Sequence, residues 1–146
     1  MNTRMRVAKV LVVIGPIAMV IGAIDPLEGA FIAVPGSATV ALGAYFAQSP
    51  KCKLVYSGFI VLAIYLATIM IATALGGWGA NARVLRSDWY GLCLLLFPVG
   101  WLMCAAGNMF ALTELFEGQA ATAIWGLATV AVLVWQCFLA QLLLGH

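Results

Sequence analysis

Five long runs of apolar residues, separated by short polar connections, make up most of the chain. A helix that crosses the hydrocarbon core of a bilayer needs about 20 apolar residues, and backbone groups in lipid must be hydrogen-bonded internally. The runs lack the alternation that is typical of barrel strands, so they predict transmembrane helices. The five predicted spans are residues 7–24, 30–47, 54–75, 90–111 and 120–144.

These spans leave no room for a soluble domain. We therefore predict a single integral membrane domain over residues 1–146, an all-α bundle of five transmembrane helices with short loops. The composition agrees, because 65% of the residues are hydrophobic and only 8% are charged, against about 25% charged in an ordinary soluble domain. Seven basic and five acidic residues are too few for a nucleic-acid-binding surface. Soluble enzymes and nucleic-acid-binding proteins are excluded together.

Two of the spans have alternative interpretations. The second is short, with Pro35 and Gly36 in its first turns, so a re-entrant hairpin is the alternative to a full span. The first follows the basic residues Arg4 and Arg6, which is typical of a signal peptide. Its apolar run of about 18 residues exceeds the usual 7–15 of a signal peptide. We expect both segments to be full spans. Pro16, Pro35 and Pro98 are each expected to bend or break their helix locally.

The basic residues predict an orientation, because cytoplasmic loops carry an excess of Lys and Arg. With the N-terminus inside, five basic residues face the cytoplasm: Arg4, Arg6, Lys9, Lys51 and Lys53. Only Arg83 and Arg86 face the other side. The N-terminus is therefore predicted to be cytoplasmic and the C-terminus to lie on the outer side.

None of the twelve Asp, Glu, Lys and Arg side chains lies in the middle of a predicted span, which disfavours proton relays and ion pumps. The mid-membrane polar residues are Asn108, Gln136, Thr68, Thr73 and Thr129, with Gln141 nearer the end of the fifth span. An amide that bridges two helices contributes about 1 kcal/mol, and we interpret Asn108 and Gln136 as intramembrane packing contacts. The alternative is a ligand-binding cleft that both amides line.

The cysteines do not form a recognisable metal or redox motif. Cys52, Cys93, Cys104 and Cys137 include no Cys-x-x-Cys pair, and the single histidine is His146. We therefore predict no metal site, no cofactor and no catalytic residue, and we interpret the thiols as small apolar side chains. Two alternatives stay open, a disulfide between Cys93 and Cys137 if the last two spans meet on the outer side, and acylation of Cys52.

Five charged residues belong to the outer connections, Asp88 among them. Asp25 and Glu28 lie between the first two spans, and Arg83 and Arg86 lie between the third and fourth. We predict ion pairs between these two loops. The alternative is an outer-cap site for a lipid headgroup or a substrate.

Small residues recur along the predicted helices, among them Ala33, Ser37 and Ala41 of the second span and Gly100 and Gly107 of the fourth. Such residues let membrane helices approach closely. With no chemical motif beside them, they favour a non-enzymatic protein that acts by helix packing, as an accessory or assembly subunit of a larger membrane complex.

The expected partners of such a subunit are the lipid bilayer and other membrane subunits or a second copy of the chain. The short loops favour a bacterial inner membrane. The first alternative is a protein that binds or transports a small molecule or a lipid, as a homo-oligomer. A membrane-embedded enzyme acting on lipid or thiol substrates is the second.

Overall fold

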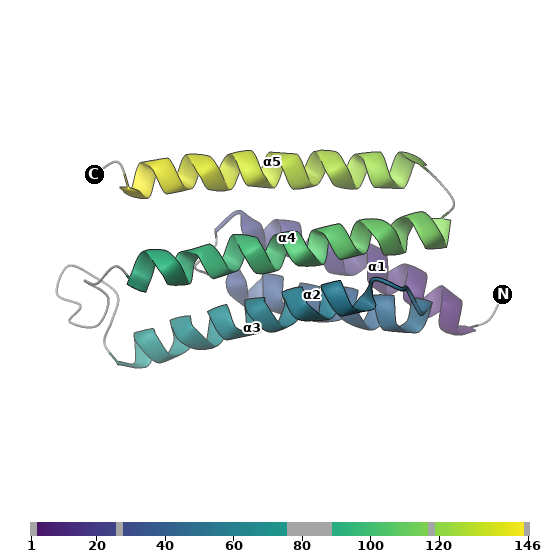
Figure 1. The fold of residues 1–146 in the computed structure, drawn as a ribbon, viewed down its shortest axis with the longest axis horizontal. Coiled ribbons are helices and arrows are strands. Elements are labelled where there is room, and N and C mark those ends of the chain that lie inside the picture. Colours follow the sequence, from purple (N-terminus) through teal and green to yellow (C-terminus); the bar gives the residue numbers. More distant parts are fainter. Residues whose placement is uncertain (1–2, 26–27, 76–88, 117–118, 145–146) are drawn as a thin grey trace.

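The chain is all-helical in a computed structural model that describes residues 3–25, 28–75, 89–116 and 119–144 (Figure 1). Side chains are described outside 89–94, 119–122 and 139–144. The helices are α1 (Thr3–Ala23), α2 (Ala30–Ala47), α3 (Cys52–Ala74), α4 (Trp89–Phe116) and α5 (Gln119–Leu144). Each runs antiparallel to the one before it, and the predicted helical bundle is confirmed.

Four of these helices are long and apolar enough to cross a membrane. They are α1, α2, α3 and the Leu95–Phe116 part of α4. In α5 the apolar stretch with described side chains is Ala123–Phe138, which is shorter than a span. Large apolar side chains are exposed around the bundle, including Ile64 of α3 and Leu95 of α4. A surface of this kind fits the lipid phase, and the four spans indicate an integral membrane protein.

The second apolar segment forms one continuous helix, with no reversal at Pro35. α1 and α4 likewise continue through Pro16 and Pro98, so none of the three prolines breaks its helix. α2 ends at Ala47, and the capping residue Gln48 adopts the left-handed conformation with φ of 55°. The N–H groups of Gln48 and Ser49 donate to the last carbonyls of the helix, which satisfies its C-terminal end.

α1 and α2 pack with their backbones in close contact, because glycines occupy both sides of the interface. A Cβ on Gly15 would lie 2.8 Å from the carbonyl oxygen of Gly36, and a Cβ on Gly36 would lie 2.9 Å from that of Gly15. Gly43 meets the backbone of Val12 in the same way, at 3.0 Å. Membrane helices gain no hydrophobic stabilisation from contacting one another, so such close packing is a main source of association.

α3 and α4 repeat this arrangement. A Cβ on Gly58 would lie 2.8 Å from the carbonyl oxygen of Gly100, and a Cβ on Gly100 would lie 3.0 Å from that of Gly58. At one end of this interface, the ring centres of Tyr65 and Phe97 lie 5.3 Å apart. α1–α2 and α3–α4 are thus two helical hairpins, each closed by a reciprocal pair of glycines.

A buried tryptophan joins the two hairpins. The indole N–H of Trp101 on α4 donates to the carbonyl oxygen of Met19 on α1 at 3.0 Å, and both side chains are fully buried. An indole N–H that is removed from water needs such an acceptor. The bond fixes α4 against α1, and the core therefore continues across both hairpins.

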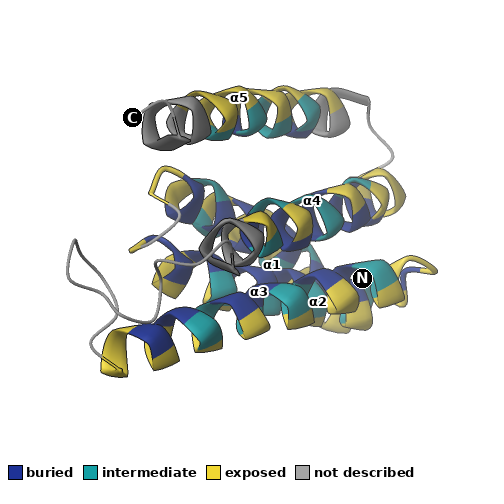
Figure 2. Ribbon diagram, turned by 60° about the vertical axis from the view of Figure 1, so that its left-hand side comes forward, coloured by how far each residue is buried: buried dark blue, intermediate teal, exposed yellow. Residues whose placement is uncertain are grey.

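α5 lies against the outside of this four-helix core (Figure 2). Its buried residues within the described stretch are Trp125 and Val132, which are seven residues apart and therefore share one face. Its other side is exposed, and Ile124 and Leu127 retain 69% and 72% of their accessible surface. α5 therefore buries one narrow stripe and leaves a wide apolar face without a protein neighbour among the described residues.

Candidate functional site

Asn108 is the most unusual polar residue of the described core. Its side chain is fully buried, and neither amide atom has a hydrogen-bond partner within the described part of the chain. Trp101, Ala105 and Asn108 follow one another at helical spacing, so Asn108 lies on the face of α4 that meets α1 and α5. Leaving a buried amide unpaired costs about 1–3 kcal/mol. The predicted interhelical contact of this amide stays a prediction.

The contact between α5 and α4 is formed by tryptophan. The indole N–H of Trp125 donates to the carbonyl oxygen of Ala105 at 3.1 Å, and its ring lies 6.2 Å from that of Trp101. Near the other end of α5, Trp135 donates to the carbonyl oxygen of Ile24 at 2.9 Å. These two hydrogen bonds set the register of α5 on the core.

That register separates the two amides that were candidates for one cleft. Gln136 lies eleven residues beyond Trp125, toward the start of α4, whereas Asn108 lies three residues beyond Ala105 in the opposite direction. At 1.5 Å per residue the two side chains are about 20 Å apart along the helix axes. Gln136 is half-buried, and its amide nitrogen has no partner among the described residues. The two residues do not form a common site.

The threonine hydroxyls of the spans form hydrogen bonds within their own helices. Thr68, Thr73 and Thr129 each donate a hydroxyl hydrogen bond to the carbonyl oxygen four residues earlier, at 2.8–2.9 Å. This local bond is the usual arrangement of threonine in a helix. It pairs the hydroxyl hydrogen of each threonine within its own helix.

The outer-cap residues are described only in part. Asp25 and Glu28 are exposed in the turn between α1 and α2, where the carboxylate of Asp25 accepts a hydrogen bond from the backbone N–H of Glu28 at 3.4 Å. Arg83 and Arg86 lie outside the described residues, so the predicted ion pairs stay a prediction. The hydrogen bond between Asp25 and Glu28 stabilises the turn between α1 and α2.

The described cysteines are free thiols in three different surroundings. Cys104 is buried and donates to the carbonyl oxygen of Val55 at 3.4 Å, Cys52 is half-buried, and Cys137 is exposed. No group of three or more His, Cys, Asp or Glu side chains within the described residues is placed to hold a metal ion. The side chain of Cys93 lies outside those residues, so its pairing with Cys137 stays open.

The described basic side chains all lie at one end of the bundle, where α1 begins and where α2 and α4 end. They are Arg4, Arg6, Lys9, Lys51 and Lys53, and we call this set the basic end. The antiparallel arrangement brings them together, because Lys51 and Lys53 lie at the connection that returns from α2 to α3. Asp25 and Glu28 lie at the opposite end.

The glycine register of the first hairpin was missed by sequence reasoning. Five glycines occur at intervals of exactly seven residues: Gly15, Gly22, Gly29, Gly36 and Gly43. This interval keeps a residue near one face of an α-helix, and its presence on both apolar segments was a signal that the two segments face each other.

Comparison with known proteins adds no further assignment. No family model, no curated protein and no solved structure matches the chain.

Proposed function

We propose that this protein is a non-enzymatic accessory or assembly subunit of a larger membrane complex. In this proposal α5 completes a five-span bundle in a bacterial inner membrane, with the N-terminus in the cytoplasm and the C-terminus outside. The gathering of the described basic residues at one end supports that orientation. The observation that carries the proposed role is the outward face of α5.

Gly126 lies on α5 where no neighbour meets it. A Cβ added there would have nothing within 4 Å, whereas one on Gly15, Gly36, Gly58 or Gly100 would meet the backbone of another helix. Large exposed side chains flank Gly126, including Leu127 and Val130. A small residue between large ones forms the depression into which a second membrane helix packs. The feature that joins the helices within each hairpin is therefore available on α5 for another chain.

The binding of a small molecule in a shared cleft receives less support. That alternative needs Asn108 and Gln136 on one cavity, and the register of α5 places them about 20 Å apart. The unpartnered amide of Asn108 is compatible with a ligand, but Gln136 does not lie beside it.

Gly126→Leu tests the proposed role. The tagged protein is solubilised from native membranes in mild detergent, purified by its tag and measured by native mass spectrometry. We expect stoichiometric membrane subunits with the wild type and their loss with Gly126→Leu, since leucine fills the depression and its Cβ meets nothing within 4 Å in the chain. Ala67→Leu is the matched control, because Ala67 is exposed on α3. It should retain the subunits.

Two results would contradict the proposal. A wild type that purifies alone, as a monomer or a homo-oligomer, has no partner complex to assemble. A bound small molecule of defined mass in that preparation would instead support the binding alternative.

A further inference from the structure

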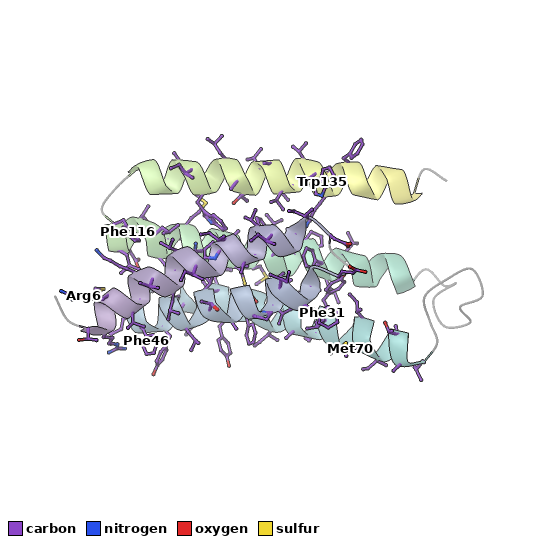
Figure 3. All side chains as sticks on the ribbon, turned by 180° about the vertical axis from the view of Figure 1, so that it is seen from behind. Arg6, Phe31, Phe46, Met70, Phe116 and Trp135 are labelled. Carbon is purple, nitrogen blue, oxygen red and sulfur yellow. The ribbon has the colours of Figure 1, made fainter. Side chains whose placement is uncertain are left out.

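The basic end carries more positive charge than its own chain neutralises. Arg4, Arg6, Lys51 and Lys53 are exposed and Lys9 is half-buried. Figure 3 shows Arg6 at this end together with Phe46 and Phe116. Glu114 is the one carboxylate of the described residues there, and it forms no ion pair with any of the five cations. Among the described residues, the basic end therefore presents five cations and one carboxylate to its surroundings.

Two of the cations lie over aromatic rings of α4. The ammonium nitrogen of Lys9 is 5.1 Å from the ring centre of Phe116, and that of Lys51 is 5.5 Å from the ring centre of Phe110. Attraction between a cation and an aromatic face holds each ammonium group in place. Lys9 comes from α1 and Lys51 from the connection before α3, so two separate segments bring charge to α4.

Both rings belong to the C-terminal part of α4, next to the basic end. Phe110 and Phe116 keep 47% and 39% of their surface exposed, on the apolar outside of a helix that is long enough to span a membrane. In a membrane, a basic side chain near the end of such a helix extends to the boundary between the hydrocarbon region and the headgroups. The phosphate of a phospholipid occupies the same depth, with its acyl chains extending toward the rings.

We propose that the basic end binds the phosphate of an anionic phospholipid, with Lys51 and Lys53 as the main contacts and the exposed ring of Phe110 against an acyl chain. This inference goes beyond the proposed subunit role and does not rest on it. Clusters of four to eight basic residues next to a membrane helix attract anionic lipids, and each residue strengthens binding several-fold. Free phosphate shares the headgroup chemistry but lacks the chain that would contact the ring.

The test titrates the purified full chain, in an uncharged detergent, with phosphatidylglycerol and with phosphatidylcholine while binding is followed by microscale thermophoresis. We expect tighter binding of phosphatidylglycerol, weakened about ten-fold by the double substitution Lys51→Gln and Lys53→Gln. The matched control is Arg83→Gln with Arg86→Gln, which removes the same charge from the segment between α3 and α4. We expect it to change binding less than two-fold, because Leu75 and Trp89, which border this segment, lie at the end of the bundle opposite the basic end, and salt screens distant charge.

Further measurements identify the ligand and show whether a variant has lost its fold. The substitutions Lys51→Arg and Lys53→Arg keep the charge and should keep the binding. Inorganic phosphate at millimolar concentration should leave phosphatidylglycerol bound, and displacement would show that a free anion is the ligand. Equal loss in both charge-removed variants, or equal binding of the two lipids, overturns the proposal. Circular dichroism of each variant shows whether its helices are intact.

Discussion

The four-helix core and α5 are attached by different kinds of contact. Within the core, helix backbones touch at Gly15 and Gly36 and again at Gly58 and Gly100. α5 is attached by two indole hydrogen bonds, from Trp125 and Trp135, with most of its surface exposed. In a membrane both kinds of contact stabilise, but close backbone packing acts along a whole interface, whereas a hydrogen bond between helices averages about 0.6 kcal/mol. The core should therefore be rigid and α5 separable from it.

Gly36→Ala should give the largest effect on the core. The added Cβ would lie 2.9 Å from the carbonyl oxygen of Gly15 and from the backbone nitrogen of Met19, and neither can move without moving α1. We expect the free energy of unfolding to fall by about 2–3 kcal/mol. Unfolding by sodium dodecyl sulfate in mixed micelles, followed by circular dichroism, measures this change. An unchanged midpoint would show that α1 and α2 do not pack through their backbones.

The interface between α1 and α2 could be predicted from the sequence only in part. The pattern of apolar runs predicts the helices, and the small residues Ala33, Gly100 and Gly107 lie at helix contacts as expected. The pairing of helices did not follow, because a small residue fits against any close neighbour. The seven-residue interval between Gly15, Gly22 and the glycines of α2 contained that information.

The candidate site was less predictable than the fold. Asn108 and Gln136 both stand out as polar residues in apolar runs, but their separation depends on how α5 slides along α4. That register is set by Trp125 and Trp135, whose acceptors are backbone carbonyls present at every residue of the chain. A buried indole predicts that some acceptor exists. The sequence does not say which one.

Two tryptophan substitutions separate the core from α5. Trp101→Phe removes the bond to Met19 inside the core and leaves a small cavity, so we expect a loss of about 2 kcal/mol in global stability. Trp125→Phe removes the bond to Ala105 between α5 and the core, with an expected loss of about 1 kcal/mol or less.

The two tryptophan substitutions should also destabilise different helices. Hydrogen exchange measured by mass spectrometry should quicken throughout α1–α4 in Trp101→Phe but only in α5 in Trp125→Phe, because a loosely packed element opens before the whole protein does. If Trp125→Phe accelerates exchange in α1 and α2 as well, α5 belongs to the same cooperative unit as the core, and the contrast between the two regions is wrong.

Gly126→Ala makes the same chemical change as Gly36→Ala in the other region and should have the smallest effect. No atom lies within 4 Å of the added Cβ, so no contact is strained. Alanine favours a helix over glycine by up to about 1 kcal/mol, and this gain should appear as slower hydrogen exchange in α5, with an unchanged detergent midpoint for the core. A loss of stability as large as that of Gly36→Ala would show that the outward face of α5 is packed against this chain. In that case the face would not be open to the second helix that the proposed subunit role requires.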